Sequence, residues 1–164
     1  MPIIASEIQY RLSGGAANAD PMLSLGGIMS GTAQPLALFD TIVGAESAAG
    51  DVEYRCIYVR NGNASLALQT AALFIQANTV SADTQIAVGL GTAAVNAAEQ
   101  TVANESTAPV AVTFSEPATL GAGLALGSIP AGQFKSVWVR RTVNVAAAAS
   151  NDTYNLRTTG DTAA

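Results

Sequence analysis

FKSVWVRRTV, residues 134–143, is the clearest β-strand signal in the chain. Successive side chains of a strand point to opposite faces, so Val137, Val139 and Arg141 are expected on one face. Trp138 and Arg140 are then expected on the other face. The fold around this stretch is therefore expected to be built from strands.

Further strands are expected on both sides of this stretch. In residues 52–59, Glu53, Arg55, Ile57 and Val59 share one face and the residues between them share the other, so both faces are partly covered. The remaining candidates are residues 3–12, 66–77, 84–90, 110–114 and 153–159, with a glycine-interrupted apolar stretch at 120–129. No strand is followed by a long amphipathic helix. About seven or eight short strands of this kind predict an all-β, antiparallel β-sandwich.

Residues 13–35 form a glycine-rich segment without a regular apolar period. Such a segment is expected either to lie on its own domain or to extend as an arm onto a neighbouring subunit. Its apolar members would anchor it: Leu23, Leu25, Ile28 and Met29. We therefore expect an N-terminal strand and arm over residues 1–44 and a β-sandwich domain over 45–164. Residues 44–51 are expected to be a loop, and a short helix within 93–102 is one option.

The chain is poor in charged residues. Only 12% of its residues are charged, against about 25% in an ordinary soluble domain. A free monomer usually keeps more surface charge for solubility, so one interpretation is that much of the surface meets neighbouring subunits. The alternative is an alanine-rich genome. The net charge of −5 and the 7 basic residues argue against nucleic acid as a partner.

The first residues, Met1 to Glu7, lack the basic and long apolar segments of a secretory signal. No apolar run reaches the roughly 18 residues that a membrane-spanning helix needs. We therefore expect synthesis in a cytoplasm and no membrane partner.

The chain has few reactive side chains: no histidine, one cysteine and one lysine. Acid–base catalysis near neutral pH usually relies on histidine, and transition-metal sites rely on histidine and cysteine. The acids Glu46, Asp51, Glu53 and Asp83 are expected in or beside surface loops, where carboxylates are solvated. No loop has the dense Asp spacing of a calcium site. We therefore expect a protein that is not an enzyme, without catalytic residues, cofactor or metal.

Arg140 and Arg141, beside Trp138, form the densest charged and aromatic cluster. Because adjacent strand residues point to opposite faces, at least one arginine is expected to face solvent, a loop or a neighbour. Two interpretations stay open: surface arginines at a strand edge, or an intersubunit anchor, since Arg and Trp dominate interface energetics. Cys56 is expected to be a small buried hydrophobe, with an intersubunit disulfide as the alternative.

Several stretches, taken in order, are similar to small virion structural proteins of tailed bacteriophages. The resemblance runs nearly end to end and includes the closing residues 160–164. It is carried by Tyr10-Arg11-Leu12-Ser13-Gly14-Gly15-Ala16, Ser24-Leu25-Gly26-Gly27, Gly50-Asp51-Val52-Glu53-Tyr54-Arg55-Cys56, Ile129-Pro130-Ala131-Gly132 and Val137-Trp138-Val139-Arg140-Arg141-Thr142-Val143.

The resemblance implies an immunoglobulin-like β-sandwich located on the virion. It implies a decoration or cement protein on the outside of the head, made in the bacterial cytoplasm. Its partners would be the major capsid protein and copies of itself. A tail or neck component with a host- or glycan-binding surface is the alternative. The candidate interface comprises Leu23, Leu25, Ile28, Met29, Trp138, Arg140 and Arg141.

Overall fold

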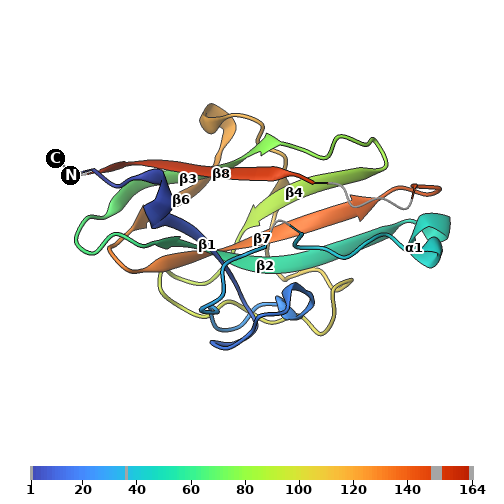
Figure 1. Ribbon diagram of the computed structural model, residues 1–164, viewed down its shortest axis with the longest axis horizontal. Coiled ribbons are helices and arrows are strands. Elements are labelled where there is room, and N and C mark those ends of the chain that lie inside the picture. Colours follow the sequence, from blue (N-terminus) through green and yellow to red (C-terminus); the bar gives the residue numbers. More distant parts are fainter. Residues whose placement is uncertain (1, 36, 149–152, 163–164) are drawn as a thin grey trace.

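Two antiparallel sheets pack face to face in the computed structural model, which describes residues 2–35, 37–148 and 153–162 (Figure 1). One sheet has the strand order β1-β2-β7-β4-β5 and the other has β6-β3-β8. The all-β sandwich prediction is confirmed at this level. The strands are β1 (Ile8–Leu12), β2 (Asp51–Asn61), β3 (Leu68–Ala77), β4 (Thr84–Leu90), β5 (Phe114–Ser115), β6 (Leu124–Ile129), β7 (Phe134–Val143) and β8 (Asn155–Thr162).

The centre of the larger sheet is the pair β2–β7, whose register runs from Asp51↔Val143 to Arg60↔Phe134. One face of this pair sends Ile57, Val59, Val137 and Val139 toward the smaller sheet, where Leu73 of β3 joins them in the main core. The alternation predicted for residues 52–59 and 134–143 is therefore confirmed. Burial of this apolar surface between the sheets is the main stabilising term of the fold.

The other face of β2 and β7 carries a second buried cluster of Cys56, Tyr58 and Trp138. No strand of the described chain covers this face. Met29 and Val102, both from irregular segments, pack against it instead. Loops therefore form a third layer over the larger sheet.

Helical turns are few and short: η1 (Ala5–Glu7), η2 (Pro21–Leu23), α1 (Gly44–Ala49) and η3 (Leu120–Ala122). The prediction of a loop over 44–51 is wrong, because α1 occupies most of it. The Glu46 carboxylate accepts a hydrogen bond of 2.8 Å from the Val43 N–H at the start of this helix. Gly50, with φ +73°, follows its end. No helix of the described chain is long and apolar enough to cross a membrane.

Strand boundaries differ most from the sequence predictions in two places, with smaller shifts where residues 66–77 and 153–159 were expected and β3 and β8 lie. The expected strand over 3–12 begins with a 3-10 turn and becomes a strand only at Ile8. The expected strand over 110–114 is reduced to the two residues of β5, and Ala111 has φ +58°, which an extended strand does not allow. The optional helix within 93–102 is absent, since these residues are irregular.

Candidate functional site

Two irregular segments, residues 13–35 and 91–113, cover the outer face of the five-stranded sheet, and we call them the loop layer. The Cys56 N–H of β2 donates to the Ser24 carbonyl at 2.7 Å. The two segments also bind each other, since the Val102 N–H donates to the Leu25 carbonyl at 2.9 Å. Of the two options for the glycine-rich segment, the described structure therefore shows it lying on its own domain.

Tyr58 fastens the loop layer to the sheet. Its hydroxyl donates to the Gly27 carbonyl and accepts from the Glu99 N–H at 2.9 Å. The buried Glu99 carboxylate accepts from Ser136 of β7 and from the Ala93 N–H. Burial alone would raise the pKa of Glu99, but these hydrogen bonds outweigh it and lower the pKa to about 2. Glu99 is thus a charged structural anchor inside the loop layer.

The predicted anchors of the glycine-rich segment separate into two pairs. Met29 packs on the buried Cys56 cluster, and Leu25 is half-buried. Leu23 and Ile28 instead point outward, with 59% and 60% of their surface exposed. The loop layer therefore presents apolar side chains to the outside from a backbone that hydrogen bonds hold in place.

Trp138, Arg140 and Arg141 are not gathered on a free surface. Trp138 is completely buried, because β7 is an inner strand that is covered on both faces. Arg140 is half-buried, with its guanidinium 5.2 Å from the centre of the Phe114 ring. Arg141 is 6% exposed and points to the face opposite Trp138. Neither Trp138 nor Arg141 is accessible to another subunit in this chain as folded.

Arg141 belongs to a buried ion-pair network at one end of the sandwich. Its Nε donates to Glu53, and its Nη2 lies 3.1 Å from Oδ1 of Asp40. Arg55 pairs with Glu105 and lies 3.9 Å from Oε1 of Glu53. The network therefore joins strands β2 and β7 to residues from two loops.

Phe39 lies between the two arginines of this network. The Arg55 and Arg141 guanidinium carbons are 5.4 and 5.0 Å from the centre of its ring. Such cation–π contacts stabilise a guanidinium that has left water. Tyr154 meets the same ring at 6.5 Å, and its buried hydroxyl has no hydrogen-bond partner among the residues that the structure describes.

Glu53 is the residue that sequence reasoning misplaced. It was expected to be a solvated acid, yet it is completely buried in β2. Burial raises the pKa of Glu53 to about 7, and the hydrogen bond and charge of Arg141 offset only part of this effect. The alternation of β2 carried the missing signal, because Glu53 shares its face with the core residues Ile57 and Val59.

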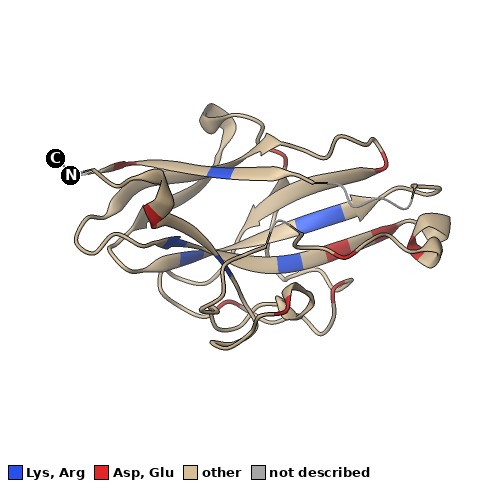
Figure 2. Ribbon diagram, viewed as in Figure 1, with Lys and Arg blue, Asp and Glu red and all other residues tan. Residues whose placement is uncertain are grey.

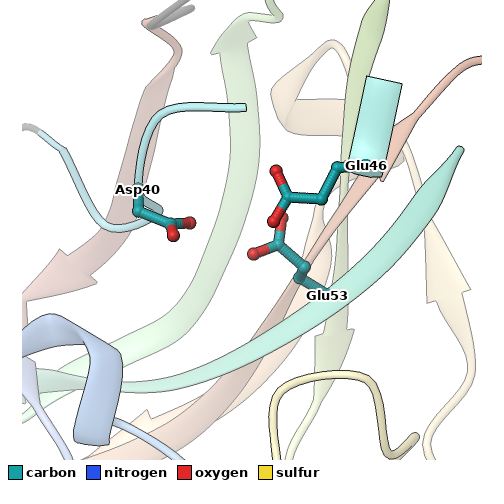
Figure 3. Close-up of side chains that lie close together, drawn as sticks. All are labelled: Asp40, Glu46 and Glu53. Carbon is teal, nitrogen blue, oxygen red and sulfur yellow. The ribbon is translucent and has the colours of Figure 1, made fainter. Parts of the chain in front are cut away.

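Asp40, Glu46 and Glu53 bring their carboxylates together (Figure 3), with oxygens within 4.8 Å of one another. Arg141 already binds two of these carboxylates, and Glu46 accepts the Val43 N–H. A metal ion at this position would compete with a guanidinium that is held in place. We therefore interpret the trio as part of the ion-pair network.

The potential nucleophiles, Cys56 and Lys135, have structural roles. Cys56 is completely buried, and burial raises the pKa of its thiol far above the ordinary value. Lys135 donates to the carbonyls of Gly91 and Ala93, and burial lowers the pKa of its ammonium. Cys56 thus fills the second core, as predicted, and Lys135 attaches the loop layer to β7.

A polar groove of about 500 Å³ lies at the β3–β4 connection. Its lining consists of Asn78, Thr79, Val80, Ser81, Ala82, Thr84, Gln85, Glu116 and Asn144. Gln85 and Glu116 are hydrogen-bonded to each other at 2.7 Å. The lining contains no aromatic side chain on which a sugar ring could stack.

No family model, no curated protein and no solved structure matches this chain.

Proposed function

We propose that this protein is a non-enzymatic structural component of a tailed-bacteriophage virion that decorates the outside of the head. In this role it would bind the major capsid protein lattice and copies of itself, and hold neighbouring capsid subunits together. The proposal includes an immunoglobulin-like type for the sandwich, which the sequence resemblance implies.

The main support for the proposal is that apolar side chains of the loop layer point outward. Leu23, Ile28 and Val110 are 59%, 60% and 76% exposed. Contiguous exposed apolar patches mark protein interaction sites, so the proposal requires that these three side chains act together as one contact surface. Hydrogen bonds within the loop layer hold the backbone of these residues, and the adjacent Ser24 and Gly27 bond to Cys56 and Tyr58 of the sheet, so binding would cost little conformational entropy. This display suits attachment to a large, regular partner.

The chemistry of the buried charges also favours a structural role. Glu53, Arg55 and Arg141 are buried beside groups of opposite charge, Lys135 is buried against backbone carbonyls, and Glu99 is buried against hydroxyl and backbone N–H donors. These contacts join strands to loops. The same side chains are therefore used to hold the loop layer and the sandwich end in place.

The alternative is a tail or neck component with a glycan-binding surface, and its candidate locations are the polar groove at the β3–β4 connection and a smaller cavity lined by Tyr10, Tyr154 and Asn155. Glycan sites usually pair polar groups with an exposed aromatic side chain. Every aromatic residue of this chain is buried or half-buried, and none lines the groove. We therefore favour the head.

The test is to locate the protein on a phage particle and to measure what it does there. Particles lacking the protein are heated or osmotically shocked with and without added purified chain. The proposal predicts that the wild type restores resistance and appears by cryo-electron microscopy over the capsid lattice. The L23E/I28E variant should bind weakly, whereas V80E, at a residue 95% exposed outside the loop layer, should bind normally.

Density confined to the tail or neck would contradict the head placement. Equal particle stability with and without the protein would contradict the cementing role. Normal binding by L23E/I28E, shown to be folded by circular dichroism, would remove the loop layer as the contact surface.

A further inference from the structure

We propose that β8 pairs with β8 of a second copy, antiparallel and around a twofold axis, so that two three-stranded sheets become one six-stranded sheet. Two features of β8 support this proposal. Its outer edge is open and regular, and opposite charges lie along it at positions symmetric about Thr159. This pairing requires no virion partner, so it can be tested on the purified chain.

The outer edge of β8 is unpaired in the described chain, since β8 is the last strand in the order β6-β3-β8. The corresponding edge of the other sheet is protected. There the Gln34 N–H donates to the Tyr10 carbonyl, and the Leu12 N–H donates to the Thr32 carbonyl, so residues 30–34 run along β1. An unpaired row of N–H and C=O groups is a ready template for another strand.

The backbone of β8 is regular enough to accept a partner. The β3–β8 register shifts fall between Gln69 and Ala72 and between Ile75 and Ala77, and the extra residues lie in β3. β8 itself pairs continuously along Leu156, Arg157, Thr158 and Thr159. It contains no proline, and its outer face is exposed at Asn155, Arg157 and Asp161. Of the devices that block edge pairing, bulges and prolines are therefore absent from β8, whereas charged side chains are present at Arg157 and Asp161.

Arg157 is the basic residue for which the described part of the chain supplies no side-chain hydrogen bond, ion pair or ring contact, although its charge acts on Tyr10. The chain has 7 basic residues, and the other six make hydrogen bonds, ion pairs or ring contacts: Arg11, Arg55, Arg60, Lys135, Arg140 and Arg141. Asp161 uses one carboxylate oxygen to accept from Thr70. Figure 2 shows these two charges as one blue and one red band along β8.

The spacing of these two charges makes the strand complementary to itself. In an antiparallel pair centred on Thr159, Arg157 of each copy lies opposite Asp161 of the other. Both residues share one face of the strand, because their separation is even. Directly opposed side chains have Cβ atoms about 4.5–5.5 Å apart, within reach of an ion pair. The dimer would therefore contain two equivalent Arg157–Asp161 pairs.

The experiment measures the oligomeric state of the full chain by sedimentation velocity over a range of concentrations and salt. The wild type should show a reversible monomer–dimer equilibrium that weakens with added salt. Each single charge reversal, R157D or D161R, places like charges opposite each other twice and should weaken dimerisation roughly tenfold or more. R60D reverses the same charge on β2 and should dimerise like the wild type.

The two reversed variants provide a sharper test when they are mixed. R157D presents two acids and D161R presents two arginines, so the mixture should form a heterodimer that neither forms alone, detectable by native mass spectrometry. The double variant R157D/D161R should dimerise like the wild type. A monomeric wild type at the highest attainable concentration would overturn the proposal. Dimers that resist both single reversals, or a mixture that stays monomeric, would overturn it equally.

Discussion

Glu53 should make the folded state less stable as the pH rises through neutrality. Its pKa is about 7 in the folded chain against an ordinary value of 4.5. A raised folded-state pKa means that folding favours the protonated form, so the stabilisation is complete below about pH 4.5 and is lost as the pH rises through about 7. Linkage between these two pKa values gives a loss of about 2.5 kcal/mol between about pH 5 and about pH 8.5.

The cause is the burial of the Glu53 carboxylate, with the nearby Asp40 charge acting in the same direction. Arg141 and Arg55 act in the opposite direction but do not cancel it. The chain has no histidine, so the usual source of pH dependence in this range is absent. Urea unfolding, followed by tryptophan fluorescence at a series of pH values, measures the effect directly.

The E53Q variant separates this carboxyl from the rest of the chain. Glutamine keeps the shape and can accept the Arg141 hydrogen bond, but it does not titrate. Its free energy of unfolding should therefore be nearly constant over the same range. E116Q, at an exposed acid on the surface, should keep the wild-type pH dependence. A wild-type stability that is flat or rises with pH, or an equal slope in E53Q, would refute the reasoning.

Three further predictions concern packing. G26A should lower the free energy of unfolding by at least about 2 kcal/mol, because φ is +99° and a Cβ would overlap the Gln100 carbonyl. G15A has φ +118° but open space around the added Cβ, so it should lower the free energy of unfolding by less in the same urea titration. The Cys56 thiol should react with a thiol reagent only after unfolding, and rapid native reaction or an intersubunit disulfide would contradict its burial. L73A should destabilise the chain by about 2–5 kcal/mol, since Leu73 is completely buried between the sheets, and a smaller loss by thermal or urea unfolding would show that the core collapses around the cavity.

The strands could be predicted where local pattern and tertiary environment agree. Residues 84–90 alternate and are bounded by loops, and β4 has these same limits. The two central strands are predicted from the alternation of their side chains between two faces, over residues 52–59 and 134–143. In each case the side-chain period of two is imposed by the pleat and needs no knowledge of the partner strand.

The loop layer and the ion-pair network could not be predicted in the same way. Residues 13–35 have no period, and their position depends on contacts with residues 91–113 that lie far away in the sequence. Helix α1 is capped at its start by one carboxylate, that of Glu46. The composition of this stretch predicts a loop instead. Glu53 is the clearest example of what sequence patterns miss. The strand alternation already places its side chain on the core face, but its charge led to the prediction of a solvated acid.

The low charge of the chain acquires a more specific meaning from the structure. The chain has 7 basic and 12 acidic residues, and among those that the structure describes five are buried: Glu53, Arg55, Glu99, Lys135 and Arg141. The outside is therefore no richer in charge than the chain as a whole, and copies packed side by side would repel one another weakly. The two proposed contact surfaces also do not compete. The loop layer covers the outer face of the five-stranded sheet, at the bottom of Figure 1, whereas β8 ends the other sheet, at the top. One copy could thus use both proposed surfaces at once, the loop layer toward a lattice and β8 toward a second copy.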